Sequence, residues 1–287
     1  MKKYVIFTDS SCDLSEKAIA ERGISYASLS FRFDDSSKEY RNGDMSASDF
    51  YEKMRKGGVA KTAAANSEDF INGFTPLLEK GLDILYIGFS SALSTTFNSA
   101  RLAANELKEK YPERKIFTVD TLAASAGIAL LIDSLLKMQN EGATIEQVRD
   151  FAEKSKLNIC HWFTVDDLVY LKRGGRVSPA TAFVGNMLGI KPILHVDNEG
   201  RLTSLSKARG RRASIIALAD KYGESASPMG GRAYISHSDC ESDALLLAEI
   251  LKEKYGAKTE LITNVGPVIG AHSGPGTLAL FFYGKER

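Results

Sequence analysis

Short apolar runs alternate with helix-like stretches along the first half of the chain. The runs that predict buried strands are Val5–Phe7, Ile84–Ile87 and Ile116–Asp120. Elsewhere in this half, apolar residues recur at three- and four-residue spacing, which is typical of helices. The expected helices are one that carries Phe50, Tyr51 and Met54 and is capped by Ser46 or Ser48, then Asn66–Lys80, Ser94–Lys110, Thr121–Asn140 and Thr144–Lys156. Strands that alternate with helices indicate a mostly parallel sheet with helices on both faces.

The second half of the chain has a different pattern. Residues 191–197 and 201–205 flank a turn that contains Gly200, which predicts a β-hairpin. Further elements are expected as strands at Ala233–Ile235, Thr259–Ile262 and Thr277–Tyr283 and as a helix over Ser242–Lys254. We therefore expect an α/β fold of two domains. Residues 1–160 would form an α/β/α domain with a mostly parallel sheet, and residues 161–287 a smaller α/β domain with a mixed sheet.

The composition is that of a globular protein with a large core. The chain has 287 residues, of which 44% are hydrophobic and 25% charged, and no run of 18 apolar residues that would predict a transmembrane helix. The apolar stretch after Met1–Lys3 ends at Phe7, which is too short for a signal peptide. Three widely spaced cysteines (Cys12, Cys160 and Cys240) without a C-x-x-C pair argue against a disulfide framework or a zinc ribbon. We expect a cytoplasmic protein.

Positive charge is concentrated in one segment of a chain whose net charge is only +1. Residues 172–212 hold nine basic side chains against Asp197 and Glu199, a net charge of +7. These stretches lack interleaved aromatic residues, so we do not expect a nucleic-acid partner. The segment is either a solvated surface or a face that meets a phosphate-bearing ligand or an acidic protein, since arginine suits planar recognition of carboxylate and phosphate.

The turn Gly88–Thr96 is the segment most suggestive of a binding site. It joins a buried strand to a helix and carries five hydroxyls, those of Ser90, Ser91, Ser94, Thr95 and Thr96. Ligands of open α/β sheets lie beyond the carboxyl ends of the strands, and a helix N-terminus favours anions. Capping of the helix by Ser94 is the simpler explanation, but capping needs one hydroxyl rather than five. We expect an anion or polar-ligand site here.

Three further segments are candidates for the same crevice. Thr8–Ser11 follows the first strand and forms either part of the site or an ordinary Asp/Ser turn. Thr62 could present a hydroxyl. Gly270–Gly276 surrounds His272 with glycines, which let backbone approach a ligand closely. The other histidines show no metal spacing and are expected to be structural: His161, His195 and His237.

Two catalytic motifs are incomplete in this chain. Neither a P-loop nor G-x-G-x-x-G after a strand is present, so no nucleotide-binding loop is predicted. Gly88–Ala92 approaches the G-x-S-x-G nucleophile elbow but lacks its second glycine. A serine hydrolase that uses Ser90 or Ser94 with His272 is therefore an alternative function, and it predicts labelling by a fluorophosphonate probe.

Taken together, these segments resemble the DegV family, which includes the fatty-acid-binding (FakB-type) subunits of bacterial fatty acid kinase. The resemblance spans nearly the whole chain and depends on the order and spacing of several motifs. The motifs are Thr8–Ser10, Lys61–Thr62, Ser90–Ser94 with Asn98–Ala100, Val119–Thr121, Leu168–Ser178, Lys191–Leu194, Lys207–Arg209 and Gly270–Gly276.

The resemblance implies that a long-chain fatty acid is bound, with no other cofactor and no metal. Its carboxylate would contact Thr62 and Ser94 in the hydroxyl-rich region that includes Ser91 and Thr95, with His272 close by. Arg173 and Arg209 would face an ATP-dependent kinase subunit, which phosphorylates the carboxylate to an acyl phosphate used in phospholipid synthesis. The chain itself would not be catalytic. A peripheral or transient membrane contact is compatible with this role.

The chain departs from the family pattern at three places. Ala63–Ala65 stand where Ser-Gln-Pro is usual, Thr95 stands where Gly is usual, and Thr121 stands where Ser is frequent. Thr95 would either narrow the approach to the carboxylate or supply another hydroxyl. A module that binds a different lipid-like anion and uses its basic face for a partner is the third hypothesis. The preferred chain length and the oligomeric state are not predicted.

Overall fold

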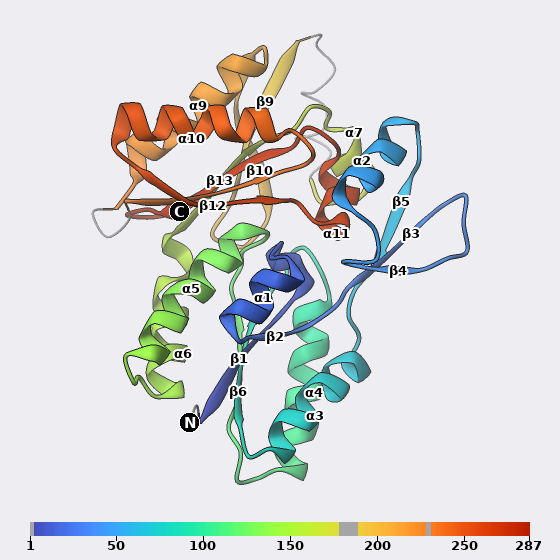
Figure 1. Ribbon diagram of the computed structural model, residues 1–287, viewed down its shortest axis with the longest axis vertical. Helices are drawn as coiled ribbons and strands as arrows, with labels where there is room; N and C mark the ends of the chain where they lie inside the picture. The colour runs from blue at the N-terminus through green and yellow to red at the C-terminus, as the bar shows by residue number, and fades with distance from the viewer. Residues whose placement is uncertain (1–2, 178–188, 228–230) are drawn as a thin grey trace.

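The computed structural model describes residues 3–177, 189–227 and 231–287 (Figure 1). Met1, Lys2 and Ser178, which belong to segments discussed above, lie outside the described residues. The first sheet is parallel throughout, as the alternating pattern predicts. Its strands, in spatial order, are β2 (Ser25–Ala27), β1 (Tyr4–Asp9), β6 (Asp83–Gly88) and β7 (Ile116–Asp120).

Helices cover both faces of this sheet. Side chains alternate along each strand, so successive residues pack against opposite helical layers. Val5 and Phe7 of β1 face one helical layer, whereas Tyr4 and Ile6 face the other. The Phe7 ring packs edge-on against Phe74, with centroids 4.8 Å apart. The first layer consists of α3 (Ser67–Glu79) and α4 (Thr96–Lys110), and the second of α1 (Glu16–Arg22), α5 (Ala126–Asn140) and α6 (Ile145–Ser155).

The second sheet is mixed, again as predicted. In spatial order it contains β10 (Leu202–Arg209), β9 (Ile190–Val196), β8 (Ile159–Thr164), β13 (Leu278–Tyr283), β11 (Arg232–His237) and β12 (Lys258–Asn264). Its neighbours pair antiparallel, except β11 with β12. Leu280 and Phe282 pack toward α9 (Arg211–Ser225) and α10 (Glu241–Tyr255), whereas Phe281 points to the opposite face.

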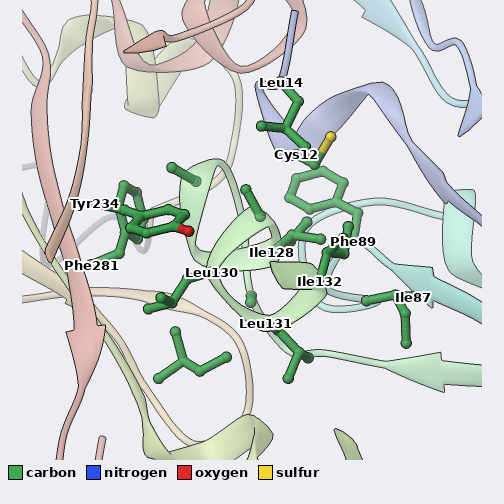
Figure 2. Close-up of a cluster of buried hydrophobic side chains, with 14 of the residues drawn as sticks. Cys12, Leu14, Ile87, Phe89, Ile128, Leu130, Leu131, Ile132, Tyr234 and Phe281 are labelled. Carbon is green, nitrogen blue, oxygen red and sulfur yellow. The ribbon is translucent and has the colours of Figure 1, made fainter. Parts of the chain in front are cut away.

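Helix α5 lies between the two sheets. Its residues from Ala126 to Ile132 are all buried, which is typical of a helix enclosed on every side. Figure 2 shows Leu130 of α5 beside Tyr234 and Phe281 of the mixed sheet, and Ile128 and Ile132 near Phe89. One apolar core therefore spans both sheets. The division of the chain at residue 160 stays a prediction.

A third, antiparallel sheet was not expected from the sequence. It contains β4 (Tyr40–Arg41), β3 (Ser30–Phe33) and β5 (Ala60–Ala63), and it packs with α2 (Ala47–Arg55) and α11 (Pro267–Ser273) around Phe31 and Phe50. The Tyr51 hydroxyl donates to the carbonyl of Val265 at 2.7 Å, which ties this sheet to the C-terminal part of the chain. The described residues also form three short helices: η1 (Ser10–Cys12), η2 (Lys156–Asn158) and α7 (Val169–Arg173).

The prediction of a helix that starts at Thr121 was wrong. Helix α5 begins at Ala126, and Leu122 and Ser125 before it have φ values of 52° and 56°. Thr121 Oγ1 donates to the Gly88 carbonyl at 2.7 Å and accepts from the Ala123 amide at 3.1 Å. A side-chain bond to a nearby backbone amide, such as the one between Thr121 and Ala123, competes with helix formation. The segment 121–125 is thus a fixed turn, whereas the other expected elements agree with the structure to within a few residues.

Candidate functional site

A cavity of about 530 Å³ lies among the three sheets. Its volume is within the range of small-molecule sites. Most of its wall is apolar and includes Phe89 and Leu93 from the hydroxyl-rich turn, Phe163 from β8 and Phe281 from β13. All five side chains expected to contact a ligand head group line the cavity: Thr62, Ser91, Ser94, Thr95 and His272. The structure brings them together, and their roles as carboxylate contacts stay predictions.

Thr62 and His272 contact each other in this wall. Thr62 lies on β5, and its Oγ1 is 2.8 Å from Nε2 of His272, which lies on α11. The other ring nitrogen, Nδ1, is buried and has no hydrogen-bond partner among the described residues. Unpaired buried N–H groups are rarer than unpaired acceptors, so the arrangement favours the tautomer with the proton on Nε2. In that tautomer Nε2–H donates to Thr62, and the Thr62 hydroxyl hydrogen can be donated to a ligand.

The His272 imidazole is neutral near pH 7. Burial, together with the positive charge of Arg176, lowers its pKa from 6.5 to about 4. Gly174 lies against the same ring, since a Cβ added to it would be 2.1 Å from Nδ1. His272 therefore acts in the cavity wall as an uncharged, tightly packed group.

In the hydroxyl-rich turn, the N-cap position of α4 lies one residue after Ser94, the residue of the simpler capping explanation. Thr95 occupies the N-cap position and its side chain makes no capping bond. Ser94 Oγ instead accepts from the Thr96 amide at 3.2 Å and lies 2.9 Å from Thr96 Oγ1. Ser91 and Thr95 are exposed and Ser94 is half-buried, so hydroxyl groups surround the helix N-terminus at the cavity wall. This is a suitable setting for an anion.

Ser90, in contrast, has a structural role. It is fully buried, and its Oγ donates to the Gly200 carbonyl at 2.9 Å. Gly200, at φ 78°, is in the turn of the β9–β10 hairpin and packs directly against this hydroxyl. Within the described part of the chain, neither Ser90 nor Ser94 is hydrogen-bonded to His272. The geometry gives no support to a serine nucleophile activated by this histidine.

Comparison with known proteins agrees with this architecture. The profile of the family described as "Uncharacterised protein, DegV family" matches residues 3–285. The chain is a member of the DegV family. It is 42% identical over 291 residues to a DegV domain-containing protein of Clostridium perfringens, covering 100% of this chain and 99% of that one.

The names of one further relative and of one solved structure describe a ligand. A "fatty acid-binding protein" of Thermotoga maritima is 36% identical over 244 residues, covering 83% of this chain and 82% of that protein. The crystal structure of a DegV lipid-binding protein from Thermotoga maritima has a TM-score of 0.87 at 32% identity and covers 99% of both chains. The fold expected from the resemblance is thus confirmed.

Two of the three departures from the family pattern lie at the cavity, whereas the third, Thr121, does not line it. Ala63, Ala64 and Thr95 all line it, whereas Ala65 is buried beside it in the core of the α3–α4 layer. Thr95 has φ −74°, a backbone conformation that any residue adopts, so a side chain fits there without strain. In this DegV protein the wall near the helix N-terminus carries a hydroxyl and a methyl group that a glycine would lack.

The glycines near His272 serve packing within the protein. Gly270 lies against Tyr51 and Gly274 against Tyr170, where an added Cβ would come within 2.3 Å of each ring or its hydroxyl. Neither glycine lines the cavity. The structure thus gives these two glycines a packing role, and backbone approach of this segment to a ligand stays a prediction. They allow α11 to pack closely enough against two tyrosines to place His272.

Thr8–Ser11 forms an Asp/Ser turn away from the cavity wall. Asp9 caps η1 by accepting from the Ser11 amide at 3.1 Å. Its second oxygen accepts from the Tyr86 hydroxyl at 2.7 Å and the Phe89 amide at 3.1 Å. The buried Asp9 carboxylate therefore holds the start of the hydroxyl-rich turn in place through the Phe89 amide.

A second polar patch of the wall was missed from the sequence. Ser125 and Ser236 line the cavity with their Oγ atoms 2.9 Å apart, and Ser125 also donates to the Asp13 carboxylate. Burial raises the pKa of Asp13 to about 7. His161 also lines the cavity, but its two ring nitrogens contact backbone groups of Ile159 and Ala124. These residues are far apart in the sequence and are brought together only by the tertiary fold, so no local motif predicts the patch.

The basic residues divide into two groups. Arg173 and Arg209, expected to face a partner, are exposed and lie outside the cavity. Arg176, three residues after Arg173, turns inward and lines the cavity. Among the described residues, no group of three His, Cys, Asp or Glu side chains is arranged to hold a metal. None of the described helices has the length and apolarity needed to cross a bilayer.

Proposed function

We propose that this protein binds one long-chain fatty acid, with the carboxylate at the Thr62, Ser94 and His272 end of the cavity. The observation that carries the proposal is that these three side chains line a largely apolar cavity. An amphiphile with one small polar head fits such a wall. The name of the Thermotoga maritima relative, a fatty acid-binding protein, supports the same ligand class.

The head group would be held by neutral donors. The Thr62 hydroxyl, released by the Nε2–H···Oγ1 contact, and the Ser94 and Thr95 hydroxyls can donate to carboxylate oxygens. The exposed Ser91 hydroxyl lies on the same wall. A carboxylate removed from water needs several such bonds, because an unpaired buried charge is costly.

The acyl chain would supply most of the affinity. Burial of a methylene contributes about 0.8 kcal/mol, so a long chain gains on the order of 10 kcal/mol before the costs of association. Apolar side chains of both large sheets and of the hydroxyl-rich turn are placed to contact it, among them Phe89, Phe163 and Phe281. The tail would therefore lie against the core that joins the two sheets.

We further propose that the protein presents the fatty acid to an ATP-dependent kinase subunit. That subunit would transfer the terminal phosphoryl group of ATP to a carboxylate oxygen, giving acyl phosphate and ADP. This chain has no nucleotide-binding loop, so it would serve as the carrier rather than the catalyst. The exposed Arg173 and Arg209 are suited to an acidic partner face.

The test combines the loaded protein, ATP and a bacterial fatty acid kinase catalytic subunit, with acyl phosphate trapped as the hydroxamate by hydroxylamine. Arg173→Ala and Arg209→Ala should keep fatty-acid affinity and lose most of the hydroxamate. Arg201→Ala, which removes an exposed arginine of the hairpin turn, is the matched control. Full turnover by both variants would overturn the assignment of the partner face.

The site of action would be the cytoplasm. The three cysteines are free, and Cys12 and Cys160 are buried. Unpaired cysteines suit a reducing compartment, where ATP is also available. Transfer of the acyl phosphate to phospholipid synthesis would involve a transient contact with a membrane. Fractionation of cells that express the protein tests both points.

A further inference from the structure

Arg176 is the only residue with a formally charged side chain among the described residues that line the cavity. The rest of the wall is apolar or carries neutral polar groups. The arginine is half-buried, and burial lowers the pKa of its guanidinium. A charge in this position is costly unless something compensates it.

The protein backbone fixes this guanidinium beside the proposed head-group site. Nε donates to the carbonyl of Leu93 at 3.2 Å, and Leu93 directly precedes Ser94. Nη1 donates to the carbonyl of Gly174, the residue that packs against His272. Arg176 thus connects the hydroxyl-rich turn with the wall that carries His272.

No carboxylate of the described residues forms an ion pair with Arg176. The stretches outside the description, 1–2, 178–188 and 228–230, contain no Asp or Glu, so they cannot supply one. Two other partly buried arginines have such partners, Arg22 with Asp133 at 2.7 Å and Arg211 with Asp243 at 2.9 Å, whereas the partly buried Arg287 donates to backbone carbonyls. The chain therefore leaves the positive charge of Arg176 without a counter-charge of its own.

We propose that Arg176 is the counter-ion of the bound carboxylate and makes the cavity select ionised head groups over neutral ones of the same chain length. This inference rests on the proposed fatty-acid binding. His272 cannot supply the charge because its imidazole is neutral at pH 7. The hydroxyls of Thr62 and Ser94 would bind an alcohol as readily as an acid, since they are uncharged. Discrimination between the two falls to the guanidinium.

The test measures the affinity of the full-length protein for palmitic acid and for hexadecanol, each delivered below its solubility limit. The wild-type protein should prefer the acid. Arg176→Gln should weaken binding of the acid roughly 10- to 100-fold, as expected for loss of a charge-assisted bond, and change binding of the alcohol less than about twofold. Arg176→Lys should recover part of the preference, and Arg201→Gln, at an exposed arginine outside the cavity, should leave it intact.

Three results would overturn the proposal. Equal affinity of the wild-type protein for acid and alcohol would do so without any variant. An equal loss of affinity for palmitic acid and for hexadecanol in Arg176→Gln would show that the arginine only holds the Leu93 and Gly174 carbonyls in place. Unchanged affinity of that variant for palmitic acid would show that the charge of Arg176 has no role in binding the carboxylate. In the last two cases wild-type binding of palmitic acid stands, whereas absence of that binding would contradict the proposed function itself.

Discussion

Thr62 Oγ1 and His272 Nε2 lie 2.8 Å apart although 210 positions separate the two residues in the chain. Strand β5 carries the first and helix α11 the second, and the two elements pack around Phe31, Phe50 and Tyr51. The contact orients the Thr62 hydroxyl and places a neutral imidazole at one end of an apolar cavity. Contacts within the protein therefore fix the positions of both groups.

Removal of the cavity hydroxyls should weaken fatty-acid binding. Each of Thr62→Val and Ser94→Ala deletes a donor to a charged group, which predicts a loss of roughly 10- to 100-fold in affinity. The measurement is displacement of a fluorescent fatty acid at equilibrium. Ser48→Ala, which removes an exposed hydroxyl on α2 outside the cavity, should bind like the wild-type protein. If the Thr62→Val, Ser94→Ala double variant kept full affinity, the assignment of both residues would be wrong.

Gly174→Ala should disturb the site from outside the cavity. The new Cβ would lie 2.1 Å from His272 Nδ1, so the ring must move and its contact with Thr62 must change. Overpacking of this kind typically costs about 1–3 kcal/mol of stability. We expect a lower thermal midpoint together with weaker fatty-acid binding. Gly43→Ala meets only the end of the flexible Glu16 side chain and is the control for a glycine-to-alanine change.

Binding should be nearly independent of pH between 6 and 8. The pKa of His272 is lowered to about 4, so the imidazole stays neutral throughout this range. A medium-chain acid that is monomeric in solution and ionised above pH 6 is the suitable ligand, with affinity measured by calorimetry at several pH values. A tenfold loss of affinity as the pH rises from 6 to 8 that persists in Asp13→Asn, which removes the other group that titrates near the wall in this range, would instead indicate an imidazolium that pairs with the carboxylate.

Asp13 should make folding stability depend on pH in the direction opposite to a salt-bridged aspartate. Its pKa is raised from 3.8 to about 7 by burial, so the folded protein favours the protonated form. That stabilisation is complete below about pH 4 and is lost as the pH rises to about 7. Relative to the isosteric Asp13→Asn variant, the wild-type free energy of unfolding should fall over this interval and then level off. If urea titrations gave the same difference in free energy of unfolding between the wild-type protein and Asp13→Asn at every pH from 4 to 8, the raised pKa of Asp13 would be contradicted.

The sequence predicted the elements whose pattern is local and left out those that depend on distant contacts. Short apolar runs identify β6 and β7, and the expected helix Thr144–Lys156 corresponds to α6, which starts with a capping box between Thr144 and Gln147. The start of α5 was missed because the Thr121 hydroxyl donates to the distant Gly88 carbonyl and accepts from the nearby Ala123 amide, which an apolar pattern does not encode.

The sequence predicted which residues line the cavity better than it predicted how their side chains are oriented. The resemblance and the hydroxyl-rich turn identified residues that line the cavity, including Ser94 and His272, and their contact with a head group stays a prediction. Arg176 was part of a basic motif, and nothing in that motif distinguishes the inward arginine from the outward Arg173. Only the carbonyls of Leu93 and Gly174, brought together by the fold, direct one of the two into the cavity.

The central claim is that the cavity holds one fatty acid per chain. Native mass spectrometry of the purified protein, followed by extraction and identification of its ligand, tests this directly. We predict a mass increase that corresponds to one long-chain fatty acid, lost on denaturation, and a protein stripped of lipid that takes up one equivalent of added acid. A protein that is isolated empty and takes up no fatty acid over the soluble range would contradict the account.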